Sequence, residues 1–191
     1  MVAIDLICLL MEWKVLASEY LYNGPWLTVR KDRCALPNGH VISSFYVLEY
    51  PEWVNVFALT VEEQVVLVKQ YRHGIREVGI ELPGGVVDEG ESVEEAARRE
   101  LMEETGYEFS SYEYLGKICA NPSTTNNFMH MYLAKGGRKV AEQELDHSEE
   151  LEVMLLSIEE VKQLLKENRI HQSLHANCMF YALSKLGALT Y

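Results

Sequence analysis

Two glutamates on one predicted helix are the residues whose type and spacing point to chemistry. Ser92 and Glu95 form the pattern of an N-terminal capping box, and Gly106 is suited to end the helix in a left-handed conformation. Glu100 and Glu104 lie one helical turn apart, and neither has a basic neighbour three or four positions away. Such a like-charge pair costs roughly 0.2–0.5 kcal/mol on an exposed helix. A divalent cation shared by the two carboxylates would reverse that cost. The alternative is a solvated acidic face, tolerated at small cost or neutralised by a distant Lys or Arg.

The predicted helix has one apolar side, and a strand and a turn precede it. Val93, Ala97 and Leu101 recur every four residues, which gives the helix a surface to bury. Ahead of it, Ile80–Leu82 is a predicted strand that leads into the turn Pro83–Gly85.

The rest of the chain is predicted to form strands and helices without internal repeats or interdomain linkers. Strands are predicted at Trp26–Arg33, Val41–Leu48, Val54–Thr60, Val65–Tyr71, Tyr112–Cys119, Phe128–Ala134 and Leu151–Leu156. Later helices are predicted from a second capping box, Ser157 with Glu160, to about Asn168, and over about Ser173–Leu186. Gly136 and Gly137 are predicted to open a polar, acid-rich loop. This order predicts a mixed α+β fold, a sheet with helices packed on it.

Composition and charge narrow the classes of partner. The 191 residues, 48% of them apolar, suit one globular domain with a small N-terminal extension. A net charge of −12 argues against a nucleic-acid groove or an anionic membrane surface as the main partner. A diphosphate remains compatible with this charge, because metal ions and local Arg or Lys side chains supply positive charge.

The cysteines and the chain start indicate a cytoplasmic protein. The 4 cysteines, Cys8, Cys34, Cys119 and Cys178, are far apart and lack a CxxC pattern, so we interpret them as reduced thiols. Residues 1–10 carry Asp5 in an apolar run without a basic n-region, which is not typical of a targeting signal. We hypothesise that residues 1–10 are dispensable and that Met11 is the working start.

One pair of histidines has the spacing of neighbours on a helix. His171 and His175 lie one turn apart at the start of the last predicted helix. Because no third ligand is visible, we interpret them as surface or core histidines rather than metal ligands.

The acidic helix carries a recognisable motif. Gly85 is followed by Glu91 and then by Arg99–Tyr107, which reads RELMEETGY. These residues match the Nudix box at every defined position, and the sequence therefore resembles the Nudix hydrolases. The resemblance implies cleavage, dependent on Mg²⁺ or Mn²⁺, of a nucleoside diphosphate linked to another moiety. It also implies a Nudix α/β/α sandwich over residues 52–191, preceded by a small antiparallel β-sheet within residues 1–51.

The segments around the box resemble the ADP-ribose pyrophosphatase branch of the family. Val66–Arg72, Glu81–Gly85 and Trp53–Val56 carry this likeness. A proline at a set distance past the box marks the branch, and Pro122 follows Tyr107 by 15 positions. Related sugar-nucleotide pyrophosphatases share these markers.

The resemblance assigns roles to the residues of the box. It implies that the metal ligands are Glu100 and Glu104, the carbonyl of Gly84 and, as an accessory ligand, Glu103. It implies that Arg99 holds the helix against Glu91 or Glu103. In this branch the general base is often an acid in the loop before a late strand. Here that loop is Asp146–Glu150, with Glu149 as first choice and Glu150 as second; ordinary solvation is the alternative for these acids.

Four further residues are candidates for contact with substrate. Arg72 follows a predicted buried strand, where an unpaired guanidinium is costly. We expect it to fork onto phosphate or terminal ribose, or to pair with Glu77 or Glu81. The resemblance also places Glu81 on the substrate side. Trp53 offers a stacking face for a base, as Trp26 and Tyr46 also do, although such a residue is often part of a core. Pro122 is assigned from the branch marker, with an ordinary loop proline as the alternative.

Two classes of function are compatible with the motif. The first is a pyrophosphatase that converts ADP-ribose to AMP and ribose 5-phosphate, with other nucleotide sugars and dinucleotides as alternative substrates. The second is a Nudix-fold sensor that binds nucleotide sugars without turnover. Sensors commonly lose box carboxylates, whereas this sequence keeps every one. The resemblance also implies a homodimer, because members of the branch usually exchange N-terminal strands so that the partner subunit lines the base pocket. The strands ahead of the box are compatible with that.

Overall fold

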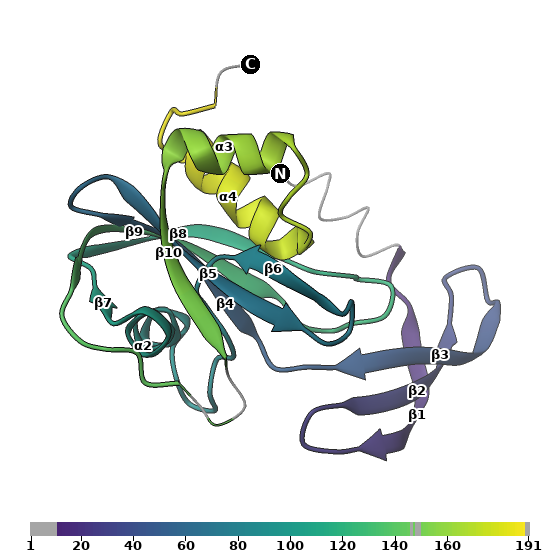
Figure 1. Ribbon diagram of the computed structural model, residues 1–191. Helices are drawn as coiled ribbons and strands as arrows, with labels where there is room; N and C mark the ends of the chain where they lie inside the picture. The colour runs from purple at the N-terminus through teal and green to yellow at the C-terminus, as the bar shows by residue number, and fades with distance from the viewer. Residues whose placement is uncertain (1–10, 146, 148–149, 190–191) are drawn as a thin grey trace. The chain divides into compact units, whose positions relative to one another are not determined.

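The computed structural model describes residues 11–145, 147 and 150–189. They form two compact units, residues 11–50 with 121–127 and residues 51–120 with 128–189 (Figure 1). The hypothesis about residues 1–10 lies outside the described residues.

The first unit is a three-stranded antiparallel sheet. It consists of β1 (Lys14–Asn23), β2 (Thr28–Ala35) and β3 (Val41–Glu49), in that order. The predicted pairing of the last two strands is confirmed, with Gly39 at φ +84° in the turn between them. The sequence did not predict β1, because every residue of this strand is exposed and it shows no alternation of buried and exposed positions. Loop 121–127 joins this unit through a bond from the Leu48 amide to the Thr124 carbonyl.

The second unit is built on a seven-stranded mixed sheet (Figure 1). Its strands are β4 (Trp53–Thr60), β5 (Gln64–Arg72), β6 (Glu77–Glu81), β7 (Tyr107–Glu108), β8 (Ser111–Ile118), β9 (Met129–Lys139) and β10 (Leu151–Ser157). The order is β10-β5-β4-β9-β7, with β6 paired to β5 and β8 to β9. β4 and β9 run parallel, whereas the other pairings are antiparallel. The predicted mixed sheet is confirmed.

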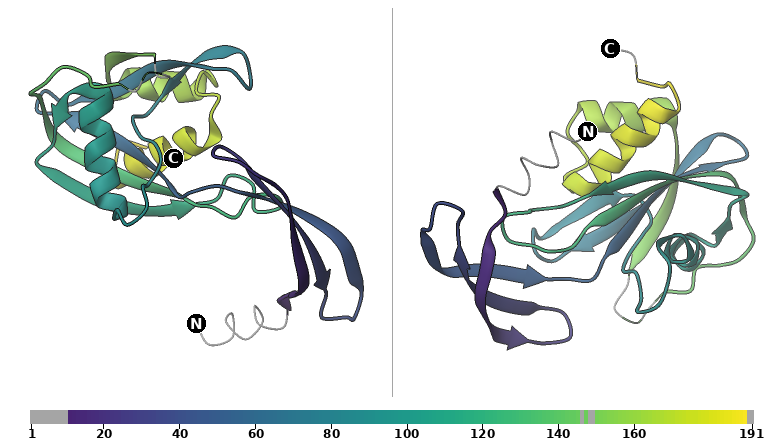
Figure 2. Two further views of the ribbon diagram at one scale, coloured as in Figure 1. Left: turned by 90° about the horizontal axis from the view of Figure 1, so that it is seen from below. Right: turned by 180° about the vertical axis from the view of Figure 1, so that it is seen from behind.

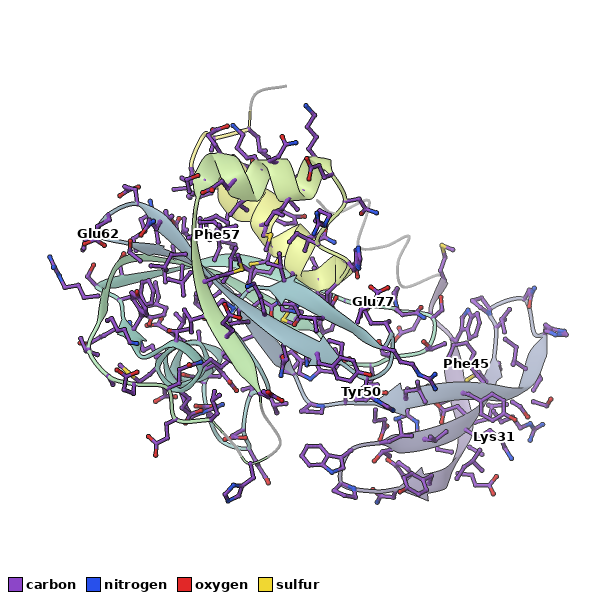
Figure 3. The ribbon with its side chains drawn as sticks, viewed as in Figure 1. Lys31, Phe45, Tyr50, Phe57, Glu62 and Glu77 are labelled. Atoms are coloured by element: carbon purple, nitrogen blue, oxygen red, sulfur yellow. The ribbon has the colours of Figure 1, made fainter. Side chains whose placement is uncertain are left out.

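Helices cover both faces of this sheet (Figure 2). Helix α2 (Val93–Thr105) packs on one face, where Ala97 and Leu101 join a fully buried cluster. Helices α3 (Ile158–Lys166) and α4 (Ser173–Lys185) cover the other, and Phe57 lies in the core between them and the sheet (Figure 3). The second unit is therefore the three-layered α/β/α arrangement that the resemblance implied.

The capping residues act as predicted. Ser92 accepts a hydrogen bond from the Glu95 amide, and the Glu95 side chain accepts one from the Ser92 amide. Gly106 ends α2 at φ +70°. The second predicted box, at the start of α3, is also present. These ends depend on contacts within four residues, which explains why the sequence predicts them.

The expected loop at Gly136 and Gly137 is wrong. Strand β9 continues through both glycines to Lys139, where it pairs with β7. The Gly137 carbonyl accepts a bond from the Val61 amide. Partners remote in sequence hold this segment extended, against the turn preference of consecutive glycines.

In the part of the chain that the structure describes, no helix combines the length and the apolar character that crossing a bilayer requires.

Candidate active site

The turn Pro83–Gly85 is held against the edge of strand β4. The Val56 amide donates to the Pro83 carbonyl at 3.0 Å, and the Val54 amide donates to the Gly85 carbonyl at 2.9 Å. Gly84 has φ +148°, and a Cβ atom there would lie 2.0 Å from the Val54 carbonyl oxygen. Because both the conformation and the space exclude a side chain, this position requires glycine.

Two buried carboxylates of α2 lie against the same turn. Glu100 and Glu104 are 9% and 5% exposed. The Gly84 amide donates to Glu104 Oε2 at 2.9 Å. A Cβ atom on Gly85 would lie 2.4 Å from Glu100 Oε1, so the missing side chain leaves the room that this carboxylate fills. The structure thus brings together Gly84, Glu100 and Glu104.

Arg99 connects the helix to the loop before it. It makes two hydrogen bonds of 3.0 Å to the carboxylate of Glu91, and one of 2.9 Å to the Val86 carbonyl. Its Nη1 atom donates to Glu100 Oε1 at 2.9 Å and to Glu103 Oε2 at 3.1 Å. The hydrogen bonds that Arg99 donates to Glu91 lower the pKa of Glu91, and the same bonds are the largest cause of the raised pKa of Arg99. Sequence alone left Glu91 and Glu103 as alternative partners, and the structure gives both.

The donors around the turn fit a hard divalent cation. Carboxylate and carbonyl oxygens are the ligands that Mg²⁺ and Mn²⁺ prefer. Glu100 and Glu104 supply carboxylates beside the glycine turn, and Glu103 contacts the same Arg99 Nη1 atom as Glu100. Among the described residues, no three His, Cys, Asp or Glu side chains already form a metal-binding group. The carboxylates are instead engaged by Arg99 and by the Gly84 amide.

Arg72 and Glu81 form a second pair, on strands β5 and β6. Arg72 donates to Glu81 Oε1 at 3.0 Å and, through Nη2, to Oε2 at 2.5 Å. Glu81 is 2% exposed, whereas the Arg72 side chain is half-exposed. Of the two acids that sequence offered as partners, the structure shows Glu81. Glu77 instead lies 2.9 Å from His171. The paired Arg72 side chain still reaches the surface, which is compatible with the predicted contact with substrate.

The structure describes three of the four remaining predicted site residues. Trp53 is half-buried at the start of β4, where its amide donates to the Phe128 carbonyl. Pro122 is exposed in loop 121–127, which belongs to the unit of the N-terminal sheet rather than to the unit of α2. Glu150 is exposed just before β10. Glu149 lies outside the described residues.

Sequence reasoning did not predict the contacts of His175. This side chain is buried at the start of α4, where Nδ1 accepts a hydrogen bond from the Leu82 amide at 3.0 Å and Nε2 lies 3.3 Å from Glu81 Oε2. Burial lowers the pKa of His175 to about 4, against the opposing effect of the Glu81 charge. Of the two interpretations from sequence, a surface or a core histidine, His175 is a core histidine. Nothing in the local sequence pointed to these partners, Glu81 at the end of β6 and Leu82 directly after it.

Two families match the chain. The NUDIX domain matches residues 50–178, and the nucleoside diphosphate sugar hydrolase N-terminal domain matches residues 13–48. The first match covers most of the chain, including the turn and the acidic helix. The protein therefore belongs to the Nudix family, and it is a Nudix hydrolase.

The chain is also similar to known proteins in sequence and in fold. The methanol dehydrogenase activator of Bacillus methanolicus is 34% identical over 86% of this chain and 89% of its own length. The ADP-ribose pyrophosphatase of Bacillus subtilis (strain 168) is 30% identical, over 90% and 92%. A crystal structure of an ADP compounds hydrolase superposes with a TM-score of 0.81 at 23% identity, over 93% of this chain and 97% of that one, and has the same fold. The resemblance inferred from the box is confirmed.

We predict that Gly84→Ala destabilises the protein by about 2–4 kcal/mol, because the new Cβ meets backbone and the left-handed conformation is strained. Urea unfolding would measure this. Gly74→Ala is the matched control, since a Cβ there meets nothing within 4 Å; its free energy of unfolding should stay within about 0.5 kcal/mol of wild type. Equal stabilities of the two variants would contradict the close approach of the turn to β4.

Proposed function

We propose that this protein hydrolyses the pyrophosphate of a nucleoside diphosphate sugar, with ADP-ribose converted to AMP and ribose 5-phosphate. The observation that carries the proposal is the pair of buried carboxylates, Glu100 and Glu104, packed against the turn Pro83–Gly85. The choice of ADP-ribose is supported by the relative in Bacillus subtilis and by another in Mycobacterium tuberculosis, 31% identical, which is also named ADP-ribose pyrophosphatase. The match of residues 13–48 to a nucleoside diphosphate sugar hydrolase domain supports the substrate class.

We further propose Mg²⁺ or Mn²⁺ as the cofactor. Glu100, Glu104 and the Gly84 carbonyl would be its main ligands, with Glu103 as an accessory ligand. When bound, a divalent cation neutralises phosphate oxygens and lowers the pKa of a coordinated water. The role of Arg99 is to hold α2 and its carboxylates against the loop of Glu91, as its hydrogen bonds indicate.

On the substrate side, we assign Arg72 and Glu81 to binding. A guanidinium held on one side by a buried carboxylate is fixed in orientation, and its half-exposed position suits a fork onto phosphate or ribose. Trp53 is proposed as a stacking surface for the base, and Pro122 as part of the substrate-binding region. The positive charge of Arg72 also offsets the diphosphate locally in a chain whose net charge is −12.

The same charge and the thiol chemistry support a small-molecule enzyme of the cytoplasm, acting on neither nucleic acid nor membranes. Among the described residues, Cys34, Cys119 and Cys178 are free thiols.

We predict metal-dependent turnover of ADP-ribose that Glu100→Gln lowers by roughly 100-fold or more, with weaker Mn²⁺ binding, because the variant removes a charged ligand. The assay is phosphatase-coupled release of phosphate from a panel of nucleotide sugars and dinucleotides, with Mg²⁺ and then Mn²⁺. Glu94→Gln is the control, since this exposed acid on the same helix pairs with Arg98.

Each outcome of that assay has a definite meaning. A preference for another nucleotide sugar or a dinucleotide would contradict ADP-ribose as the substrate. It would still support metal-dependent hydrolysis of a pyrophosphate. Binding of nucleotide without any turnover would support the sensor instead. Near-wild-type activity of Glu100→Gln would contradict the ligand assignment.

We propose Glu149 as the general base, with Glu150 as the alternative. Glu149→Gln should lower kcat by about 100-fold and leave KM within about threefold, because general-base catalysis acts on the chemical step. The fall in rate at low pH, which reports protonation of the general base, should also disappear from the pH–rate profile of this variant. Glu150→Gln and the exposed control Glu144→Gln should keep most of the activity. If Glu150→Gln shows the larger loss, the assignment passes to that residue; equal activity of all three would refute a base in this loop.

We also propose a homodimer formed through the N-terminal sheet. Strand β1 is exposed along its whole length, and Tyr20, Leu21 and Tyr22 are each 48–59% exposed. β1 is an edge strand of the described three-stranded sheet, and exposed apolar side chains on an edge strand are typical of a surface that another chain covers.

We predict that Leu21→Lys yields a monomer in light scattering and raises KM for ADP-ribose, because charge is placed in the dimer contact and the partner's share of the base pocket is lost. Phe180→Lys is the matched control, since both side chains are 48% exposed and Phe180 lies on α4. A wild-type monomer at micromolar concentration, or an unchanged dimer of Leu21→Lys, would contradict the proposal.

A further inference from the structure

A buried contact between α4 and β6 involves a histidine that the chemistry above does not use. Glu81, at the end of β6, is a buried carboxylate, and an isolated buried charge is very costly. Arg72 neutralises it from the outer side. From the inner side the ring of His175, itself 3% exposed, contacts Glu81 Oε2 at 3.3 Å.

The contacts of His175 define which nitrogen carries the proton. The Leu82 amide is only a donor, so the Nδ1 atom that it contacts at 3.0 Å carries no hydrogen. In a neutral ring the proton is then on Nε2, the atom that lies beside Glu81. The low pKa of His175 keeps the ring neutral near pH 7, which is the form that the contact with the Leu82 amide requires.

These two contacts hold consecutive residues immediately before the glycine turn. Leu82 precedes Pro83–Gly85, which lies between β4 and α2. Glu81 in turn orients the guanidinium of Arg72. His175 is therefore linked to both parts of the site through one intervening residue each. Glu81 links it to Arg72, the proposed substrate-binding residue, and Leu82 links it to the turn that carries the proposed metal ligand Gly84.

A second histidine of the same region shows that the contact with β6 is repeated at the surface. His171 Nδ1 lies 2.9 Å from Glu77 Oε2, and Glu77 is labelled on β6 in Figure 3. Both partners are about half-exposed, so this pair contributes little to stability. The buried pair is the one able to set geometry.

We propose that His175 is a positioning residue, which fixes the Arg72 guanidinium through Glu81 and fixes the glycine turn through the Leu82 amide. This rests on the proposed function, in which Arg72 binds substrate and Gly84 binds metal. The two contacts make separable demands, because Arg72 acts in substrate binding and the turn acts in the chemical step.

Amide substitutions separate the two contacts. Asn has its amide near the position of Nδ1, so His175→Asn keeps an acceptor for Leu82 and loses the contact with Glu81. We expect KM for ADP-ribose to rise about tenfold with kcat within about threefold. Gln reaches the position of Nε2, so His175→Gln keeps a donor for Glu81 and loses the acceptor. For this variant we expect kcat to fall about tenfold with little change in KM. His175→Phe should show both effects.

Two controls separate positioning from loss of stability. His171→Ala removes the exposed contact with Glu77 and should leave both constants unchanged. Val161→Ala removes buried methyl groups from α3 and lowers stability, yet it should leave KM and kcat of the folded fraction unchanged. The positioning role is wrong if His175→Asn and His175→Gln do not affect KM and kcat separately. It is also wrong if these variants lose activity only through a smaller folded fraction, as Val161→Ala does.

Nitrogen NMR of ¹⁵N-histidine-labelled wild-type protein tests the geometry whatever the substrate. We expect His175 to be neutral with its proton on Nε2 from pH 6 to 8, and a proton on Nδ1 would overturn the inference. Wild-type protein inactive on the whole panel would refute the proposed function, and the role of His175 with it. An active wild type with unchanged His175 variants would refute only the role of His175.

Discussion

The close approach of one glycine turn to a strand and a helix is the constraint on which the site depends. Gly84 meets the backbone of Val54 on one side and the carboxylate of Glu104 on the other. Any side chain at this position would push the turn away from strand β4. The two buried acids, Glu100 and Glu104, are thereby held at the sheet, where helix propensity alone would leave them in solvent.

Buried charge is compensated differently on the two sides of that turn. On the helix side a single guanidinium, Arg99, contacts Glu91, Glu100 and Glu103, so one cation serves several acids. On the strand side Glu81 has a cation at the surface and a neutral imidazole in the core. A second buried cation would add its own desolvation cost, whereas a neutral ring supplies a polar contact without it.

The parts of the fold that sequence predicted are those fixed by neighbouring residues. The starts of α2 and α3 follow from capping boxes that span four residues. Strand β1 was missed because exposure on both faces removes the periodicity that identifies a strand. The extension of β9 through Gly136 was missed because its partners, β7 and Val61, are remote in the sequence and override the local turn preference.

For the site, the sequence by itself determined which residues are the candidates, since the proposed carboxylate site for a hard cation follows from the types and spacing of Glu100, Glu104 and the glycines ahead of them. Only the tertiary structure decided which groups touch. The partners of Arg72 and the contact of His175 with Leu82, 93 positions away in the chain, depend on how α4 and β6 pack. A hydrogen bond requires two atoms to meet within a few tenths of an ångström, and no local pattern encodes a distance between elements so far apart in the sequence.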